Sequence, residues 1–401
     1  MKPSAYAWLL VALLWAIAFL NYVDRQVIYA MFPLLEADLR LGSGQLGMLS
    51  AAFLWVYAVA SPFGGYIADR FGRGRVVLAS LLVWSVVTWV TGEARDYSEL
   101  LATRALMGLS EAFYLPAALA LIAAHHSERT RATATGLHQS GLYAGIVAGG
   151  AAGGSLGQRY GWRGPFNLLL GAAGVAYSLV AAIGLRKASG ARRAGAHPPM
   201  AGSLRALLRP HGFWRLRAAF TAVGLANWLV YTWLPLFLYE RFRLSLASAG
   251  FSATFYIQAA SFAGIFAGGL LGDFFAVRHA RGRVFLQAAA LAVAAPCLFL
   301  VGSTSSLSVL VAALVAFRLG RGVYDSNAMP VLCQIAPDEL RSTSYGVFNC
   351  CSCGAGGVAA ALAGFLRASL GLGMALGIAG AVQLAAAWLL VNVRIPTRSA
   401  R

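Results

Sequence analysis

Seven ionisable side chains lie inside long apolar stretches of the chain, and these are the groups best placed to do chemistry. They are Asp24, Arg25, Arg104, Glu111, Arg318, Arg321 and Asp325. Each costs about 2.5–3.5 kcal/mol at the centre of a membrane helix, whereas a folded protein is stable by only about 5–15 kcal/mol. We therefore expect these groups to pair with one another or to line a hydrated cavity, and not to face lipid.

The spacing of these residues predicts which of them share a helix face. Arg104 and Glu111 are seven residues apart, which is two helical turns, so they lie on nearly the same face about 10 Å apart along the axis. Gly108 lies between them and leaves room for another group to approach. Asp24 and Arg25 point about 100° apart on a helix, so one can face a cavity while the other faces a neighbouring helix.

Two interpretations of these charges remain open. The first is a pair of structural salt bridges, such as Asp24 with Arg104 and Arg25 with Glu111. Such pairs add little net stability, because desolvation tends to cancel the attraction between the charges. The second is a functional site. An arginine in a wet cavity binds carboxylate or phosphate through two hydrogen bonds and keeps its proton, while burial and a nearby guanidinium act oppositely on a carboxylate, which can then carry a proton.

The apolar stretches define the class of protein. Of 401 residues, 59% are hydrophobic and 11% are charged, and the mean hydropathy is +0.68. Runs of about twenty apolar residues indicate membrane-spanning helices. We predict twelve spans, at 5–31, 44–68, 75–93, 99–124, 132–157, 163–185, 213–239, 247–272, 283–302, 306–333, 342–367 and 370–393. The first is too long for a signal peptide and has no small-residue cleavage site, so we expect it to stay in the mature protein.

The net charge of +18 is explained by membrane topology and does not indicate binding to nucleic acid. With the N-terminus inside, most Lys and Arg residues fall in predicted cytoplasmic segments, as the positive-inside rule requires. We expect both termini in the cytoplasm, a bacterial inner membrane and a monomer.

Because the chain has no His-Glu-x-x-His motif, and Lys2 and Lys187 lie in no phosphate-binding loop, we expect neither an enzyme nor a cofactor. A transporter-like sensor of nutrients remains an alternative function. The five cysteines are interpreted as packing residues.

The two halves of the chain repeat. GGYIADRFGRGRVVL after the second span corresponds to GGLLGDFFAVRHARGRVFL after the eighth, and SERTRATATG corresponds to PDELRSTSYG. One offset aligns Arg104 with Arg318, Gly108 with Gly322, Glu111 with Asp325 and Pro116 with Pro330. We therefore predict a six-helix bundle at 1–185, a cytoplasmic linker at 186–212 and a second bundle at 213–401. A parallel repeat of this kind predicts a substrate site near the midplane between the halves.

These features resemble the major facilitator superfamily over essentially the whole chain. Its loop signature, Gly-x-x-x-Asp-Arg-x-Gly-x-x-basic, is met by Gly65, Asp69, Arg70, Gly72 and Arg75, with one residue slipped at Gly74. The resemblance implies an all-α membrane protein of twelve helices in two pseudo-symmetric bundles. We expect this signature to act as a cytoplasmic gate, in which Asp69 forms contacts that break when the conformation changes. A fixed topology anchor is the alternative.

Within the superfamily, Asn-Tyr-x-Asp-Arg (Asn21 to Arg25) and Arg-x-x-x-Gly-x-x-Glu (Arg104 to Glu111) are similar to the organic anion:cation symporter branch. That branch takes up hexuronates, aldonates and related carboxylates with protons. The resemblance implies that Asp24 and Glu111 carry protons and that Arg25 binds a carboxylate. The other expected substrate-binding residues are Tyr22, Tyr57, Arg104, Gln139, Tyr231, Arg318, Asp325 and Asn349. We therefore predict a proton-coupled symporter of a small organic anion in the bilayer.

Two points of this assignment stay open. The same four charges occur in spinster-like transporters of lysophospholipids and sphingolipids, which is the alternative function. Arg318 and Asp325 depart from the sugar-acid pattern, and they either bind a second anionic or zwitterionic group or form a pair that echoes the repeat. Other polar residues in the spans, His138, Asn227, Gln258 and Asn327, are more typical of helix–helix hydrogen bonds. His125 and His126 are expected at the surface.

Overall fold

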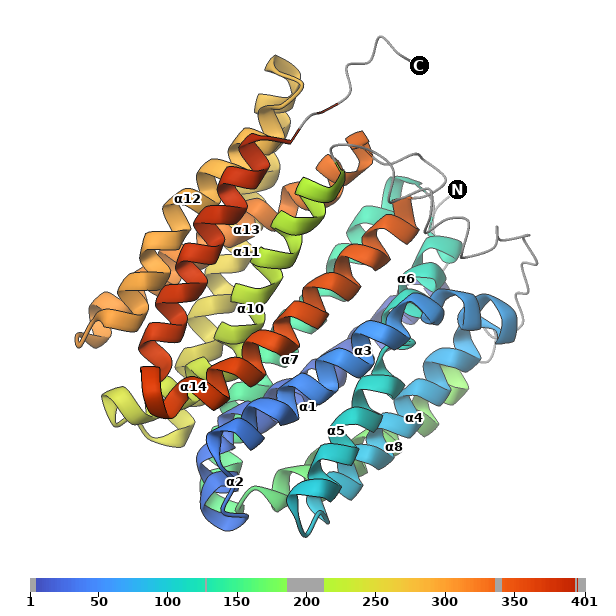
Figure 1. Cartoon of the computed structure of the whole chain (residues 1–401). Coiled ribbons are helices and arrows are strands. Elements are labelled where there is room, and N and C mark those ends of the chain that lie inside the picture. The colour runs from blue at the N-terminus through green and yellow to red at the C-terminus, as the bar shows by residue number, and fades with distance from the viewer. Residues whose placement is uncertain (1–4, 127, 186–212, 336–340, 394, 396–401) are drawn as a thin grey trace. The chain divides into compact units, whose positions relative to one another are not determined.

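The computed structural model describes residues 5–126, 128–185, 213–335, 341–393 and 395. Within these residues the chain is helical and contains no β-strand (Figure 1), which confirms the predicted all-α fold class. The predicted linker at 186–212 lies outside the described residues.

Each predicted span coincides, to within a few residues, with one or two helices. The first half comprises α1 (Ala5–Ala30), α2 (Phe32–Asp38), α3 (Ser43–Phe71), α4 (Arg73–Gly92), α5 (Tyr97–Glu111), α6 (Tyr114–His125), α7 (Glu128–Tyr160), the π-helical turn η1 (Pro165–Gly171) and α8 (Ala172–Leu185). The second half comprises α10 (Phe213–Phe242), α11 (Leu246–Arg278), α12 (Gly282–Ser303), α13 (Leu307–Ile335) and α14 (Arg341–Val391).

Ten segments of the described chain are long and apolar enough to cross a membrane. Two features account for the difference from the twelve predicted spans. α14 contains both of the last two predicted spans, because Gly371, with φ +73°, kinks the chain without ending the helical run. α7 coincides with the predicted span 132–157, but its glycines and polar side chains make it less apolar than the other long helices. The predicted pattern of helices is therefore present.

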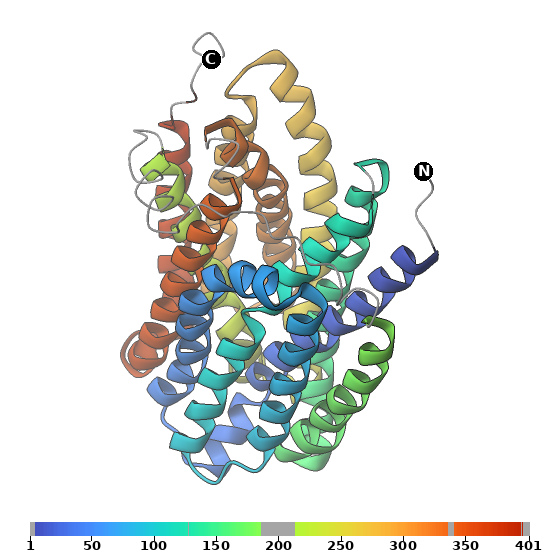
Figure 2. The same ribbon diagram turned by 90° about the vertical axis from the view of Figure 1, so that its right-hand side faces the viewer.

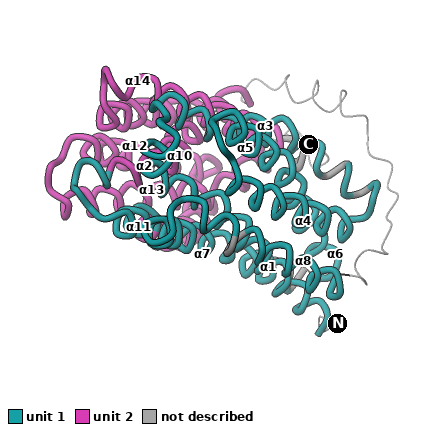
Figure 3. Tube along the Cα trace, turned by 90° about the horizontal axis from the view of Figure 1, so that it is seen from below, with its two compact units in different colours: residues 1–195, 238–254 teal, residues 196–237, 255–401 magenta. Residues whose placement is uncertain are grey.

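The chain divides into two compact units (Figure 3). Unit 1 is Met1–Gly195 with Leu238–Thr254, and unit 2 is Ala196–Phe237 with Phe255–Arg401. In unit 1, α1 packs along α7, and α4 packs against α5, α6 and α8 (Figure 1 and Figure 2). In unit 2, α12 packs against α13 and α14. Each unit has its own apolar core, which includes Trp84 in unit 1 and Phe213 in unit 2. The division into domains at 186–212 stays a prediction.

A stripe of glycines brings α7 close to α1, the helix that carries Asp24 and Arg25. A Cβ atom added at each of these glycines would lie 2.4–2.8 Å from a backbone oxygen of α1, namely Gly141 from Trp15, Gly145 from Phe19, Gly149 from Val23 and Gly153 from Val27. Small residues at this spacing let membrane helices approach closely. This stripe was not predicted, although its signal, a glycine at every fourth residue from 141 to 153, is visible in the sequence.

The stripe leads to a stability prediction. In Gly145→Ala the added methyl group meets the Phe19 carbonyl oxygen at 2.4 Å, so one helix must shift. Overpacking of this kind costs about 1–3 kcal/mol, and we expect a lower melting temperature in detergent. Gly136→Ala on the same helix is the matched control, because no atom lies within 4 Å of the added Cβ. The control should be neutral or stabilising by up to about 1 kcal/mol, and equal melting temperatures for the two variants would contradict the prediction.

The same close approach occurs in both halves of the repeat. A Cβ at Gly108 on α5 would lie 2.4 Å from the Phe53 backbone oxygen on α3. A Cβ at Gly322 on α13 would lie 2.4 Å from the Ser261 backbone oxygen on α11. These two glycines occupy equivalent positions in the sequence repeat, and each lies against the backbone of a neighbouring helix. The group that approaches Gly108 is therefore the backbone of α3.

The predicted span 99–124 is interrupted beside one of its charged residues. α5 ends at Glu111 and α6 begins at Tyr114. Pro116 has no N–H and cannot donate to the carbonyl of Ala112, which removes a helical hydrogen bond at this point. The aligned Pro330 instead lies inside the continuous helix α13. Glu111 is thereby placed at a break between two helices.

Candidate functional site

Arg25 and Glu111 form an ion pair in the interior of unit 1. Nε of Arg25 on α1 donates a hydrogen bond to Oε2 of Glu111 on α5. The two side chains are 7% and 0% exposed. Desolvation offsets much of the attraction in such a pair, but removing one partner leaves a buried charge and costs about 3–5 kcal/mol. The stability of this ion pair therefore depends strongly on whether Glu111 is charged.

Aromatic rings hold the guanidinium of Arg25 in place. Its central carbon lies 4.6 Å from the ring centre of Tyr57, 4.8 Å from that of Tyr22 and 5.1 Å from that of Phe53. Cation–π contacts are worth about 0.5–2 kcal/mol each, most when water is excluded. Tyr22 and Tyr57 were predicted from the resemblance and do lie beside Arg25. Phe53 was not predicted, because an aromatic residue on an apolar helix carries no distinguishing signal.

A second guanidinium shares the Phe53 ring. The central carbon of Arg104 lies 4.9 Å from the ring centre of Phe53, and its Nη1 donates to the sulfur of Met107 at 3.1 Å. The side chain is fully buried, and its Nε and Nη2 atoms donate to no acceptor among the described residues. Buried donors without an acceptor cost about 1–3 kcal/mol or more. The arrangement therefore has unused capacity to bind an acceptor.

Asp24 points toward a different helix from Arg25. The Thr88 hydroxyl on α4 donates to Oδ2 of Asp24 at 3.2 Å. This agrees with the expectation that the two neighbouring charges face different directions. Of the two salt bridges considered above, the described residues contain Arg25–Glu111, whereas the hydrogen-bond partner of Asp24 is Thr88 and not Arg104. Thr88 was missed, because a single hydroxyl in a span is common.

Together, Asp24, Arg25, Arg104 and Glu111 form a buried four-charge cluster. Its formal charge is zero when all four groups are ionised, and Asp24 lies within electrostatic range of Glu111 and Arg104. Oδ1 of Asp24 accepts no hydrogen bond from the described residues, and the Asn21 side chain lies close enough to Glu111 to interact with its carboxylate. The cluster therefore has sites for protons and, on Arg104, donors for an anion.

Two histidines of unit 1 are buried. Nε2 of His138 lies 2.8 Å from the Tyr114 hydroxyl, which donates to the Leu14 carbonyl oxygen at 2.7 Å. This helix–helix contact agrees with the expected role of His138. The surface position expected for His126 is wrong, because His126 is 3% exposed and its Nε2 lies 3.1 Å from the Ala7 carbonyl oxygen.

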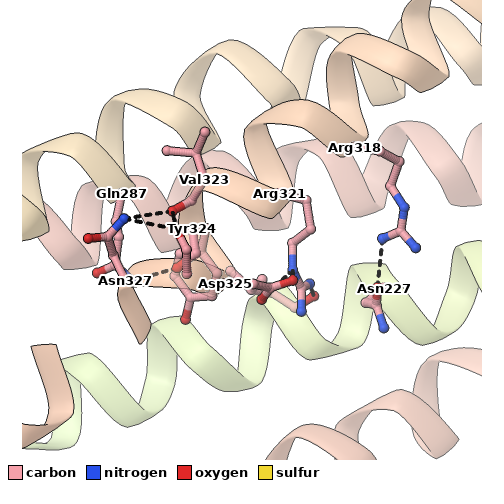
Figure 4. Close-up of polar contacts among 10 residues, drawn as sticks. Asn227, Gln287, Arg318, Arg321, Val323, Tyr324, Asp325 and Asn327 are labelled. Carbon is pink, nitrogen blue, oxygen red and sulfur yellow. Dashed lines mark hydrogen bonds and ion pairs between the residues drawn. The ribbon is translucent and has the colours of Figure 1, made fainter. Parts of the chain in front are cut away.

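The predicted site residues of unit 2 make separate contacts. Arg318 donates to Asn227, while Asp325 forms an ion pair with Arg321, one helical turn away (Figure 4). Asp325 therefore has Arg321 as an ion-pair partner. The spacing of four residues on one helix places Arg321 directly beside Asp325. Asn349 accepts a long contact, 3.9 Å, from the Cys353 thiol. Gln139 in unit 1 is half-buried, and its Oε1 accepts no hydrogen bond from the described residues.

The loop signature joins α3 to α4. Gly72 links the two helices with φ +94°, a conformation that favours glycine and explains its place in the motif. The side chain of Asp69 lies outside what the structure describes, and Arg70 and Arg75 are exposed. In the second copy, Asp273 pairs with Arg283 from the next helix, α12. The role of the signature as a gate stays a prediction.

Comparison with known proteins identifies the family. The sequence model of the Major Facilitator Superfamily matches residues 14–361. The chain is 25% identical over 388 residues to the probable galactarate/D-glucarate transporter GudP of Bacillus subtilis, covering 87% of this chain and 83% of that protein. It is 23% identical over 413 residues to the D-galactonate transporter of Escherichia coli, covering 96% and 94%.

A solved structure shares the fold. It is that of a bacterial homologue of the human lysosomal transporter Spinster, in an inward-facing and unoccupied conformation, with a TM-score of 0.80. The two chains are 21% identical, with 97% of this chain and 95% of the other covered, so the likeness concerns the fold. The family match, the helices and the homologous transporters lead to one conclusion. The chain belongs to the Major Facilitator Superfamily, and it is a multi-pass membrane transporter and not an enzyme.

Proposed function

We propose that this transporter is a proton-coupled symporter of a sugar acid that works by alternating access. The observation that carries the proposal is the buried ion pair of Arg25 and Glu111, with Asp24 and Arg104 nearby. The names of the two relatives support the substrate class, because galactarate, D-glucarate and D-galactonate are all sugar acids. The expected bacterial inner-membrane location, the cytoplasmic termini and the monomeric state belong to this proposal.

Protonation of Glu111 is the first step of the proposed cycle. The proton removes the negative charge that holds Arg25, and the four-charge cluster then carries a net charge of +1. An uncompensated charge at membrane depth costs about 2.5–3.5 kcal/mol. A carboxylate that binds to Arg25 restores neutrality through charge-assisted hydrogen bonds. Proton and anion thus stabilise each other's binding.

Release reverses these events. When the proton leaves Glu111, its carboxylate competes with the substrate for the Arg25 guanidinium, which Tyr22 and Tyr57 keep in the same orientation. The substrate loses its main contact and dissociates. Asp24 supplies a second protonation site, so a substrate with two carboxylates can be matched by two protons. Gln139, Tyr231 and Asn349 are proposed to contact the hydroxyl groups of the substrate.

The test uses purified full-length protein in liposomes with an inwardly directed proton gradient. Labelled galactarate and D-galactonate should accumulate above their equilibrium level, and a protonophore should abolish this accumulation. Lysophosphatidylcholine should not compete with uptake. Movement of lysophospholipid without movement of either acid would overturn the proposal in favour of the spinster-like alternative. Acid uptake that never exceeds equilibrium would overturn proton coupling.

A further inference from the structure

The hydroxyl of Thr88 connects α4 to the four-charge cluster. It donates to Oδ2 of Asp24 on α1 at 3.2 Å, and the two residues are 0% and 2% exposed. Both residues belong to unit 1. The proposed cycle gives Thr88 no role, although its hydroxyl contacts one of the two acids that carry protons.

Thr88 differs from the neighbouring hydroxyl residues of its helix. Ser85 and Thr91 on α4 are also fully buried, and their hydroxyls donate to the carbonyl oxygens four residues earlier, Leu81 at 2.7 Å and Val87 at 2.8 Å. A bond of this kind within the helix is common for a hydroxyl in a helix interior. The Thr88 hydroxyl instead donates to an acid on another helix, so its direction is set by that acid.

The charges around Asp24 oppose one another. The charged groups within electrostatic range of Asp24 are Glu111 and Arg104, both on α5. Glu111 repels a negative charge on Asp24 and Arg104 attracts it, while Arg25, the next residue on α1, is paired with Glu111. Oδ1 of Asp24 accepts no hydrogen bond from the described residues. The hydrogen bond that the described residues offer to this carboxylate therefore comes from Thr88.

The titratable groups of the other helices that pack against α1 lie farther along it. Tyr114 on α6 and Tyr177 on α8 donate their hydroxyl protons to α1 carbonyl oxygens at positions 14 and 13, ten or more residues before Asp24. His138 on α7 contacts Tyr114. Beside Asp24, α7 meets α1 through Gly149, whose added Cβ would lie 2.8 Å from the oxygen of residue 23.

A hydroxyl group can serve both protonation states of a carboxyl group, because it has one proton to donate and lone pairs that accept. It donates to the charged carboxylate, as it does in the structure. When Asp24 is protonated, the acid proton can be donated to the Thr88 oxygen, and the hydroxyl can turn to the carbonyl of its own helix, as in Ser85 and Thr91. A hydrogen bond to a charged acceptor is the stronger of the two, so the hydroxyl favours release of the proton.

We propose that Thr88 positions Asp24 for proton exchange and thereby sets the pH range over which the transporter binds its substrate. The inference rests on the proposed function, in which protons on the buried acids favour binding of the anion. Without the Thr88 hydroxyl, the charged form of Asp24 loses its hydrogen bond, and the protonated form persists to higher pH. Thr88 is a positioning residue that acts through Asp24.

The test measures the galactarate affinity of detergent-purified full-length protein by titration calorimetry at a series of pH values. Wild-type affinity should fall as the pH rises. In Thr88→Val, which has nearly the same shape, the midpoint of this fall should move to higher pH by about one unit, a tenfold change in proton affinity. Thr88→Ser keeps the hydroxyl and should retain the wild-type midpoint. Thr91→Val on the same helix is the matched control and should also retain it.

A second comparison shows whether Thr88 acts through Asp24. Adding Thr88→Val to Asp24→Asn should leave the pH profile of Asp24→Asn unchanged. Thr88→Ala removes the same hydroxyl with a smaller side chain, and it should show the same shift as Thr88→Val even if the melting temperature of the valine variant is low.

Two sets of results would count against the account in different ways. An unchanged midpoint in both Thr88→Val and Thr88→Ala would overturn the inference while leaving the proposed function standing. An equal shift in Thr88→Ser, or a further shift on adding Thr88→Val to Asp24→Asn, would do the same. Wild-type protein that does not bind galactarate, or binds it equally at every pH, would overturn the proposed function together with the inference.

Discussion

Glu111→Gln loses accumulation of galactarate above equilibrium in proteoliposomes with a proton gradient, while exchange of internal for external galactarate persists. Glutamine has the shape of a protonated glutamate but cannot release a proton. Arg25 then stays available to the substrate throughout the cycle, because its ion-pair partner has no charge. Substrate can still bind and cross, but the proton gradient is no longer linked to the movement. Uptake should therefore fall from several times equilibrium to equilibrium.

A matched variant on the same helix controls for this effect. Glu99 is exposed near the start of α5 and accepts a hydrogen bond from the Arg95 backbone N–H at 2.8 Å. Glu99→Gln should accumulate galactarate as wild type does. Asp24→Asn should behave as Glu111→Gln does, because Asp24 is the second buried acid of the cluster. Unimpaired accumulation in both Glu111→Gln and Asp24→Asn would rule out the proposed coupling.

Arg25→Lys should lose about 100-fold or more in affinity for both galactarate and D-galactonate. Truncating one partner of a buried, hydrogen-bonded charge pair costs about 2–5 kcal/mol, and each 1.4 kcal/mol is about tenfold in affinity. A lysine keeps the positive charge but cannot donate two parallel hydrogen bonds or stack flat on Tyr57 and Tyr22. Equilibrium binding of both acids measures the effect.

Arg159→Lys is the control for this substitution. Arg159 is also stacked on an aromatic ring, 5.3 Å from the ring centre of Tyr160, but it is exposed. The Arg159→Lys variant should therefore bind both acids with wild-type affinity. Affinities for Arg25→Lys within a few-fold of wild type would show that positive charge alone is enough, and that the fork-shaped contact to carboxylate is absent.

Much of the fold could be predicted because the length of an apolar run limits what it can form. The predicted spans agree with the helices even where two of them share α14, since Gly371 marks the kink between them. The helix break after Glu111 was not predicted. Pro116 signals it, but the aligned Pro330 lies within an unbroken helix, so the proline alone does not decide the outcome.

The charged residues of the site could be predicted from the cost of burying them, and the structure brings together the four that lie in unit 1. The neutral neighbours of these charged residues could not be predicted from the sequence. Phe53 supports both Arg25 and Arg104, yet it resembles the other aromatic residues of the spans until α3 and α5 meet at Gly108. The ion pair of Asp325 with Arg321 was not predicted, although the spacing of four residues on one helix places the two side chains together.

Proton uptake on substrate binding tests the central claim most directly. Galactarate is titrated into weakly buffered, detergent-purified protein while the pH is recorded. We expect wild type to take up protons as galactarate binds, with less uptake in Glu111→Gln at a saturating galactarate concentration. Saturable binding of galactarate by wild type with no proton uptake would contradict the claim that protonation of the buried acids prepares Arg25 for the substrate.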